Sequence, residues 1–399
     1  MSKISPIQPK LLSKINERLV LRLLQDRGPS TRAEMSKYIG VTFPTVNKAV
    51  SSLLDSALLE EIDEASSGRG RPARRLRLAC ENSQVIGVTI SRAECMVVTG
   101  GLNGVIDEDS MLSFPTPQTY DSLLLNVTTR VKQLTPSNVR TTLGVGISVP
   151  AIVDYREQRA VLSANVPLIN GKSIGKDLQA LLGHVCLIVR DTHALSLSEK
   201  LHGKAKNVPN FAMLDVCAGI GLGLVVDGRY LIGDTGYAGE IGHIPVVPDG
   251  DICHCGKRGC LETVASEWAL EERMSRLMRR RIKINEILEM AQSGNRECQL
   301  ELERMCEYLA IGVANVVNIV NPGTIYIYGQ SFDACPELLD LLVNKTEQLA
   351  LEPSFSACKF AHASGRLLDG TIASVINYLT DSLVPNLDNY VGAMGIADS

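Results

Sequence analysis

A run of cysteine and histidine residues between Glu240 and Glu262 constrains this chain more than any other feature. It reads Glu-Ile-Gly-His, nine further residues, and then Cys-His-Cys-Gly-Lys-Arg-Gly-Cys-Leu-Glu. Three thiolates and one imidazole form a ligand set that closes a tetrahedron around zinc and leaves no position for water. We therefore expect a structural Zn2+ ion bound by four residues, namely His243, Cys253, Cys255 and Cys260.

Other interpretations of this run are open at the level of sequence. The cysteines could be ordinary buried thiols or part of a redox pair, and His254 could replace His243 as the fourth ligand. A residue between two ligands usually points away from the metal that they share, which favours His243. The two flanking acids, Glu240 and Glu262, indicate a polar ligand pocket beside the metal rather than chemistry on the metal itself.

The length and cysteine usage of the chain bound its class. Its 399 residues are enough for two or three domains with sizeable cores. We find no apolar run of about 18 residues and no signal-peptide pattern, so we expect a cytoplasmic protein without a membrane partner. The eleven cysteines are irregularly spaced outside the cluster, unlike the framework of a disulfide-rich secreted protein.

Charge separates a basic head from an acidic body. Residues 1–79 contain 14 Lys and Arg against 8 Asp and Glu, a balance of +6. The whole chain has 40 against 44, so the remainder has 26 against 36, a balance of −10. This asymmetry predicts that the head alone binds nucleic acid. Aromatic residues make up only 4% of the chain, which argues against base stacking on single strands and favours double-stranded DNA.

Amphipathic stretches in the head predict a helix-turn-helix. The first stretch ends near residue 28, and Thr31 and Glu34 then form a capping box for a second, short helix. Thr42 is expected to cap a third helix, whose buried stripe would be Val46, Ala49, Val50, Leu53 and Leu54. Short polar side chains near a helix N-terminus, with a lysine close by, are typical of a recognition helix in the major groove. The predicted DNA contacts on this helix are Thr42, Thr45, Asn47 and Lys48.

A hairpin with an arginine-rich connection follows the third helix. Strands are expected at 58–62 and 76–78, and residues 69–77 hold five arginines and no acid. A charge run is often only a solvated loop. However, Gly-Arg-Gly-Arg-Pro is a flat cationic strip that suits a narrow, A·T-rich minor groove. We therefore predict a winged helix-turn-helix whose wing contacts DNA through Arg69 and Arg71.

From about residue 84 the pattern alternates between strands and helices, which predicts an α/β fold. Strands are expected at 85–90, 96–99, 104–106, 142–149, 186–189, 212–216, 221–226 and 324–328. Helices are expected at 121–134, 172–182, 192–201, 264–293, 297–320 and 368–380. We place the DNA-binding domain at residues 1–80 and the second domain at residues 81–399.

The run from Gly239 to Glu262 resembles the signature of the ROK family, which comprises repressors, open reading frames and sugar kinases. The resemblance covers nearly the whole chain and is nearest to the sugar-responsive repressor branch, which also carries an N-terminal winged helix. It implies that residues 81–399 form a two-lobed fold like that of actin and hexokinase. It further implies association through the C-terminal lobe, as a homodimer or homotetramer.

The resemblance also implies a sugar or sugar phosphate in the cleft between the lobes. The residues that match family sugar contacts are Asn165, Asp191, Glu240, His243 and Glu262. Asp191 matches the base that deprotonates the sugar hydroxyl in the kinases, and His243 would serve zinc and sugar through its two nitrogens. Carboxylates suit this task because they accept strong hydrogen bonds from hydroxyl groups. From the sequence alone, Asp191 could also be a helix N-cap.

The segments that bind ATP in the kinases are degenerate here. Where the kinases carry Asp-x-Gly-Gly-Thr, this chain has residues 89–93, Thr-Ile-Ser-Arg-Ala, whose side chains would crowd a phosphate. The second phosphate segment, Gly-Thr-Gly-Ile-Gly-x-Gly, keeps its glycines at 219–223 but has Ala218 in place of the threonine. The Gly-Gly on the adenosine side is Gly329-Gln330. We therefore expect no enzymatic activity and predict no catalytic residue.

The expected function is that of a transcriptional regulator, normally a repressor, of sugar metabolism or transport genes. A sugar or sugar phosphate in the cleft would control its binding to a DNA operator. Two alternatives remain at this point. One is an ATP-dependent sugar kinase with a DNA-binding head, and the other is a repressor relieved by a protein partner such as a sugar-transport component.

Overall fold

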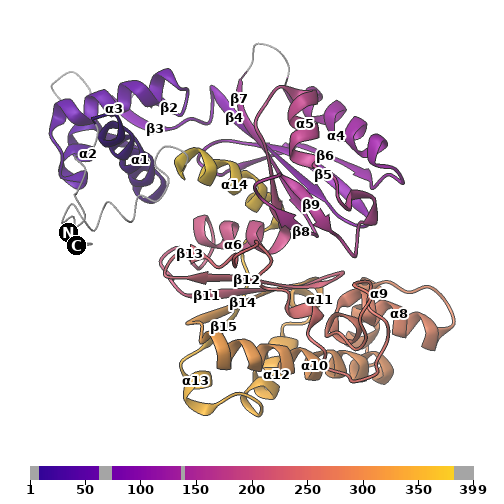
Figure 1. The fold of residues 1–399 in the computed structure, drawn as a ribbon. Coiled ribbons are helices and arrows are strands. Elements are labelled where there is room, and N and C mark those ends of the chain that lie inside the picture. Colours follow the sequence, from indigo (N-terminus) through magenta and orange to yellow (C-terminus); the bar gives the residue numbers. More distant parts are fainter. Residues whose placement is uncertain (1–8, 63–73, 136–139, 382–399) are drawn as a thin grey trace.

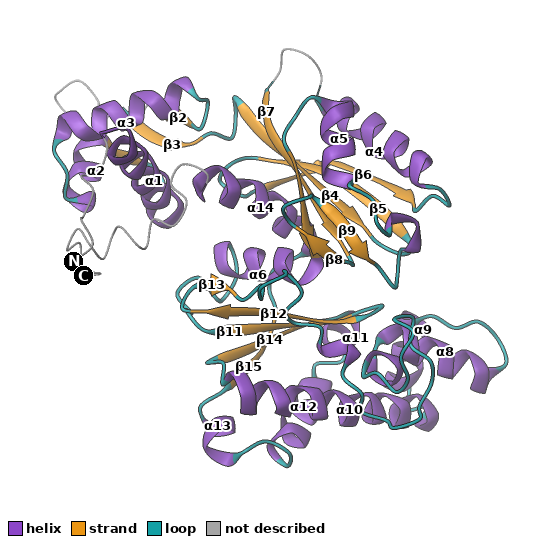
Figure 2. Ribbon diagram, viewed as in Figure 1, coloured by secondary structure: helices purple, strands orange, loops and turns teal. Residues whose placement is uncertain are grey.

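The computed structural model describes residues 9–62, 74–135 and 140–381, which form a small head and two lobes (Figure 1). Each lobe contains a five-stranded sheet. Figure 2 shows helices packed against both sheets, which confirms the predicted α/β fold. None of the helices in the described ranges is long and apolar enough to cross a membrane.

The head contains three helices and a small antiparallel sheet. The helices are α1 (Pro9–Arg27), α2 (Arg32–Ile39) and α3 (Phe43–Asp55), and the strands lie in the order β1 (Ser30–Thr31), β3 (Arg75–Leu78), β2 (Leu59–Ile62). The predicted capping box begins α2, since the Thr31 hydroxyl accepts from the Glu34 N–H at 3.2 Å and the Glu34 carboxylate accepts from the Thr31 N–H at 2.8 Å. The predicted stripe of α3 faces the core, with Leu54 only partly buried.

The buried carboxylate of Glu60 on β2 fastens the head to the first lobe. It accepts hydrogen bonds from Nε of Arg77 at 2.7 Å and from the backbone N–H groups of Cys80 at 3.2 Å and Asn82 at 3.3 Å. The Ser83 hydroxyl donates to the carbonyl of Ala57 at 2.8 Å. The segment that leaves the head is therefore held along its whole length by polar contacts.

The first lobe is a mixed sheet between two layers of helices. Its strand order is β10 (Cys186–Arg190), β7 (Thr141–Val149), β4 (Ser83–Ile90), β5 (Glu94–Gly100), β6 (Ile106–Pro115). Side chains of β4 alternate between two cores: Ile86 packs with α4 (Tyr120–Leu134) and α5 (Ile174–Leu182), whereas Val85 packs with α14 (Leu367–Asp381). A small hairpin of β8 (Ile152–Asp154) and β9 (Arg159–Leu162) and the short helix η1 (Pro167–Ile169) complete this lobe.

The second lobe repeats this layered arrangement. Its strand order is β13 (Arg229–Tyr230), β12 (Ile220–Val226), β11 (Phe211–Val216), β14 (Thr324–Tyr328), β15 (Lys359–His362). On β11, Met213 packs toward α6 (Asp191–Leu201), and Leu214 packs toward α10 (Arg296–Val320) and α12 (Glu337–Glu347). The helices α6 and α14 contact each other between the two sheets. The remaining helices are η2 (Ile241–His243), α7 (Glu262–Ala265), α8 (Glu267–Met278), α9 (Ile284–Gln292), α11 (Gln330–Ala334) and α13 (Glu352–Ser356).

The single helix predicted over 264–293 is wrong, because the chain there forms three helices. Ser266 ends α7 and caps α8, its hydroxyl accepting from the backbone N–H of Ala269 at 3.1 Å. Arg279 then adopts a left-handed conformation, with φ of 52°, and ends α8. The prediction also missed the β8–β9 hairpin, α12 and β15, and it placed the third strand of the first lobe at 104–106 instead of β6.

Candidate ligand cavity and metal cluster

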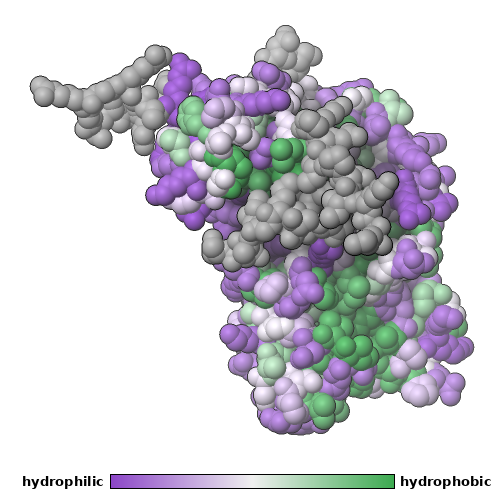
Figure 3. Space-filling view, turned by 60° about the vertical axis from the view of Figure 1, so that its left-hand side comes forward, coloured by the Kyte–Doolittle hydropathy of each residue, from purple (hydrophilic) through white to green (hydrophobic). Residues whose placement is uncertain are grey.

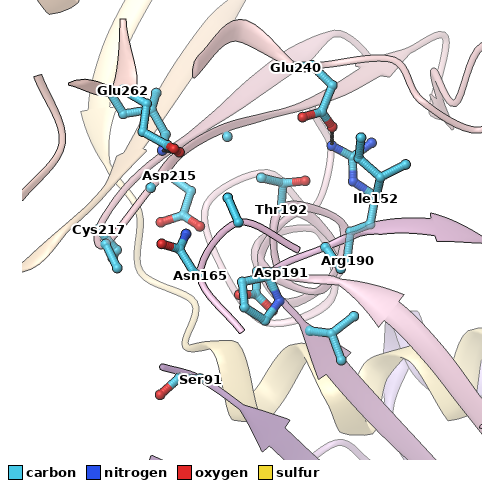
Figure 4. Close-up of a pocket in the computed structure, with 18 of the residues that line it drawn as sticks. Ser91, Ile152, Asn165, Arg190, Asp191, Thr192, Asp215, Cys217, Glu240 and Glu262 are labelled. Atoms are coloured by element: carbon cyan, nitrogen blue, oxygen red, sulfur yellow. Dashed lines mark hydrogen bonds and ion pairs between the residues drawn. The ribbon is translucent and has the colours of Figure 1, made fainter. Parts of the chain in front are cut away.

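A cavity of about 250 Å³ lies between the two lobes, lined by residues from both (Figure 4). We call it the interlobe cavity. Its first-lobe wall includes Val149 and Arg190, at the carboxyl ends of β7 and β10, and its second-lobe wall includes Asp215, near the carboxyl end of β11. The lining contains all five residues predicted to bind sugar, namely Asn165, Asp191, Glu240, His243 and Glu262.

Two acids from different lobes face this cavity. Asp191 is the first residue of α6, directly after β10, and Asp215 lies between Gly221 of β12 and Tyr328 of β14 in the second sheet. Burial raises the pKa of Asp191 to about 7. Burial, and then the negative charge of Asp191, raise the pKa of Asp215 to about 8. A polar ligand that forms hydrogen bonds with these carboxyl groups would therefore change their pKa values and their ionisation.

Asp215 was missed from the sequence. The available signal was a lone acid inside the otherwise apolar strand 211–216. The alternative reading of Asp191 as an N-cap is not borne out, because Arg190 holds the N-cap position of α6. The Asp191 carboxylate instead accepts a hydrogen bond from the hydroxyl of Ser148 on β7.

An ion pair crosses the cavity wall. Arg190 is buried; its Nη1 donates to the carbonyl of Ala238 at 2.8 Å and its Nη2 donates to the carboxylate of Glu240. The other oxygen of Glu240 lies 3.9 Å from Nε2 of His243. Glu240, one of the predicted sugar contacts, is therefore already bound by Arg190. The kinase motif that matches residues 190–193 has asparagine in place of this arginine.

Glu262 and Asn165 lie against the backbone of the second sheet. The Glu262 carboxylate accepts from the backbone N–H of Ile220 at 3.2 Å, and a Cβ at Gly219 would come within 2.5 Å of it and within 2.9 Å of Nδ2 of Asn165. Glycine at 219 is therefore needed for this close approach. Burial, as the largest effect, raises the pKa of Glu262.

Several buried polar atoms of the lining have no hydrogen-bond partner within the described part of the chain. They are Oδ1 of Asn165, Oγ1 of Thr192 and Oδ1 of Asp215. Buried polar atoms in folded proteins are nearly always paired, so such a group of orphan atoms around one cavity indicates a polar ligand.

The four predicted metal ligands form one cluster, with all their donor atoms within 4.8 Å of one another. Cys253 Sγ lies 3.6 Å from His243 Nδ1, and Cys255 Sγ lies 3.7 Å from Cys260 Sγ. The imidazole of His243 thus turns Nδ1 to the thiols and Nε2 to Glu240. Such a set of one nitrogen and three sulfur atoms fits a metal ion.

The ring of His254 does not join this cluster but packs on Trp268 of α8, with 4.7 Å between the ring centroids. The turn between the last ligands requires glycine at 259, where φ is 69° and a Cβ would come within 1.7 Å of the Val247 carbonyl oxygen. This tight turn brings Cys260 back to Cys255 within the cluster.

Ser91 and Arg92 also line the interlobe cavity, and they belong to residues 89–93, the segment that the family resemblance matches to the phosphate-binding turn of the kinases. The Arg92 guanidinium lies 5.8 Å from the ring centre of Trp268, which belongs to the other lobe. Glu267, beside Trp268, accepts from the backbone N–H of Ser331 at 2.7 Å and from its hydroxyl at 2.6 Å. Burial raises the pKa of Glu267 to about 7.

The predicted DNA contacts of α3 lie together near its N-terminus. Thr42, Asn47 and Lys48 are exposed and Thr45 is half-buried. Thr42 does hold the N-cap position, but its hydroxyl bonds to the hydroxyl of Thr45 at 2.9 Å and not to the backbone. Arg69 and Arg71 of the predicted wing lie outside the described residues. In Figure 3 hydrophobic residues gather on the face of the second lobe below the head.

Comparison with known proteins gives concordant matches. Residues 85–372 match the model of the ROK family. The chain is 26% identical over 353 residues to the DNA-binding transcriptional dual regulator NagC of Escherichia coli K12, which covers 86% of this chain and 87% of that protein. It is 26% identical over 333 residues to the xylose repressor of Bacillus subtilis, with coverage of 82% and 85%.

Solved structures agree with these relatives. The crystal structure of a ROK family transcriptional regulator, a homolog of the E. coli MLC protein, matches with a TM-score of 0.80 and 25% identity, covering 94% of this chain and 98% of that one. The ROK hexokinase from Thermus thermophilus shares the fold, with a TM-score of 0.62 and 24% identity over 75% of this chain and 99% of the hexokinase.

Proposed function

The chain belongs to the ROK family, and from this membership and its interlobe cavity we propose that it is a transcriptional repressor of sugar metabolism or transport genes. A sugar bound between the lobes would control its affinity for a double-stranded DNA operator. The observation that carries the proposal is the convergence of five predicted sugar contacts on one cavity, in a chain that also carries a helix-turn-helix head. Such a protein acts in the cytoplasm, where its operator lies.

The chemistry of the cavity supports a sugar ligand. Hydroxyl groups donate and accept hydrogen bonds, so a sugar could satisfy the orphan atoms of Asn165, Thr192 and Asp215 together. The carboxylates of Glu240 and Glu262 would accept strong bonds from further hydroxyls. A cavity of about 250 Å³ is small, which suits a monosaccharide better than a sugar together with a nucleotide.

Regulation without phosphoryl transfer fits the nucleotide side of the cavity. The side chains of Ser91 and Arg92 line the cavity where the family resemblance places glycines of the kinase turn, and Glu267 lies near enough to Asp215 to raise the pKa of that acid. The burial that raises the pKa of Asp215 and of Glu267 would also disfavour the charged phosphates of ATP beside them. We therefore propose that Asp191, although it matches a kinase base, serves as a sugar contact and not as a catalytic residue.

We propose that the metal of the cluster is zinc, held by His243, Cys253, Cys255 and Cys260. Four protein ligands would make it a structural ion, which supplies rigidity and no reaction step. Its effect would be to fix the loop that carries Glu240, His243 and Glu262, so that the cavity wall keeps its shape when no sugar is bound.

For the DNA complex we propose that residues 1–80 form the DNA-binding domain and residues 81–399 the sugar-binding and oligomerisation domain. Thr42, Thr45, Asn47 and Lys48 would contact the major groove, and Arg69 and Arg71 the minor groove. A homodimer or homotetramer would place two heads on half-sites of a pseudo-palindrome. Closure of the cavity would change the separation of the heads, and DNA would weaken sugar binding by the same factor as sugar weakens DNA binding.

The experiment that tests the proposal uses the full-length protein and an operator selected from random double-stranded oligonucleotides. DNA binding is followed by fluorescence anisotropy during titration with glucose, N-acetylglucosamine, xylose and their phosphates, and ADP release is measured with the same compounds. We expect one of them to release the DNA, without ADP production. Turnover that disappears in Asp191→Asn would establish the kinase alternative. Tight DNA binding that no sugar changes would favour control by a protein partner.

A further inference from the structure

Acidic side chains outnumber basic ones around the interlobe cavity. Four carboxylates line it, from Asp191, Asp215, Glu240 and Glu262, against two arginines. One of these, Arg190, already donates to the Ala238 carbonyl and to the Glu240 carboxylate. The cavity therefore offers few unused positive groups to an anionic ligand.

Asp191 and Asp215 lie close enough for the charge of Asp191 to raise the pKa of Asp215. The Asp191 carboxylate accepts a bond from Ser148, whereas Oδ1 of Asp215 has no partner among the described residues. Because burial, and then the negative charge of Asp191, raise the pKa of Asp215, a further negative charge beside these two acids would be disfavoured. A hydroxyl or an ammonium group would instead donate to the unpartnered oxygen.

Two backbone donors beside the cavity are already engaged by the protein itself. In phosphate-binding turns, several backbone N–H groups point at the anion. Here the N–H of Ile220 donates to Glu262 at 3.2 Å, and the N–H of Cys217 donates to the Gly219 carbonyl at 3.0 Å. The remaining cation, Arg92, lies over the ring of Trp268. A phosphate would have to displace the present acceptors of these two N–H groups, or draw Arg92 away from the ring of Trp268.

We propose that the effector is an unphosphorylated sugar, whose group nearest Asp191 and Asp215 is a free hydroxyl or an ammonium group. The acid pair selects against the phosphate ester of the same sugar, because phosphate oxygens cannot donate to Oδ1 of Asp215 and because a phosphate would bring charge to a site where burial already disfavours it. This inference rests on the proposed function, since it concerns the ligand of the same cavity.

Isothermal titration calorimetry on the full-length protein tests the inference. The ligands are glucose, N-acetylglucosamine, glucosamine, glucose 6-phosphate and N-acetylglucosamine 6-phosphate, each with wild type, Asp215→Asn and Asp109→Asn. Asp109 is exposed on β6 and serves as the matched control. We expect the free form of the binding sugar to have a dissociation constant at least about tenfold lower than its phosphate, a difference of about 1.4 kcal/mol. Asp215→Asn should narrow that ratio and Asp109→Asn should leave it unchanged.

A sugar phosphate that binds more tightly than its free sugar would overturn the inference and leave the proposed function standing. A ratio unaffected by Asp215→Asn would also overturn it. Flat heats for every ligand would overturn both.

If Asp215→Asn does not fold, the pH dependence of ligand binding to the wild type still tests the inference. Phosphate binding that requires protonated acids must weaken as pH rises from 6 to about 8.5, more steeply than binding of the free sugar. Equal pH dependence of the two would contradict the acid pair as the selecting element.

Discussion

The guanidinium of Arg190 donates a hydrogen bond to the carboxylate of Glu240, so an ion pair joins the end of β10 in the first lobe to the metal-cluster segment of the second. The two side chains are unequally buried, with 7% of Arg190 exposed against 30% of Glu240. Loss of Glu240 would therefore leave a buried positive charge with a single carbonyl partner. Loss of the acid should therefore destabilise the protein more in this pair than in a typical surface ion pair.

Glu240→Gln should lower the free energy of unfolding by about 1–3 kcal/mol, because a charged hydrogen bond to a buried group is lost. Urea denaturation measures this change. Glu303→Gln is the matched control, since Glu303 pairs with Arg296 on the surface, where their side chains are 45% and 66% exposed. It should cost less than about 1 kcal/mol. Equal costs would show that the Arg190–Glu240 pair is not a structural link between the lobes.

Asp215 should make stability depend on pH. Its folded pKa of about 8 lies above the ordinary value of 3.8, so its contribution to stability is fully present below about pH 4 and is lost as pH rises through 8. Across this window Asp215→Asn should gain at least about 1 kcal/mol over wild type, since each unit of pKa shift is worth about 1.4 kcal/mol. Urea denaturation at several pH values checks this, with Asp109→Asn expected to run parallel to wild type. A gap between Asp215→Asn and wild type that does not grow with pH would refute it.

Removal of one thiol should empty the metal cluster. Cys255→Ser is expected to lose the metal found in the wild type by elemental mass spectrometry, and to unfold at a lower temperature. An ion saturated at a hundred times its dissociation constant stabilises the fold by about 2.7 kcal/mol. The control is Cys358→Ser, a buried thiol outside the cluster. Equal metal loss in both variants would remove the cluster as the binding site.

Trp268 should report movement of the lobes. It is the single tryptophan of the chain, and its ring lies 5.8 Å from the Arg92 guanidinium of the other lobe. Closure around a sugar should change this separation and therefore the intensity or wavelength of the emission. Arg92→Ala should weaken the response, whereas Arg156→Ala, at an exposed position of the first lobe, should not. An identical sugar response in Arg92→Ala would mean that this contact does not change on binding.

Lys48 should contribute to DNA affinity through a phosphate contact. Lys48→Ala is expected to weaken operator binding and to reduce the salt slope by about one. Fluorescence anisotropy between low and moderate salt measures both quantities. Lys132→Ala, on the exposed side of α4 in the first lobe, is the control. If the two variants bind alike, α3 does not approach the DNA through this face.

Periodicity and motifs predicted much of the fold and part of the cavity. The alternating and apolar strands, the capping box at Thr31 and the Glu240–Glu262 run are local patterns that sequence records directly. The break at Arg279 was hidden because arginine in a left-handed conformation is uncommon and carries no signal like that of glycine. The Arg190–Glu240 pair depends on how the two lobes meet, and no local pattern encodes that relationship. Asp215 was overlooked because one acid in an apolar strand does not reveal whether it faces a cavity.

The carboxylate of Glu60 has a consequence for how such regulators can be recombined. Because this carboxylate accepts hydrogen bonds from the backbone N–H groups of Cys80 and Asn82, the head is not joined to the first lobe by a flexible linker. The orientation of α3 is then fixed by the first lobe. A small rotation of that lobe on ligand binding would therefore turn α3 relative to the DNA by the same angle. A head exchanged between relatives should therefore function only when residues 57–60 and 80–83 are transferred together with it. These residues fix the orientation of α3 on the first lobe.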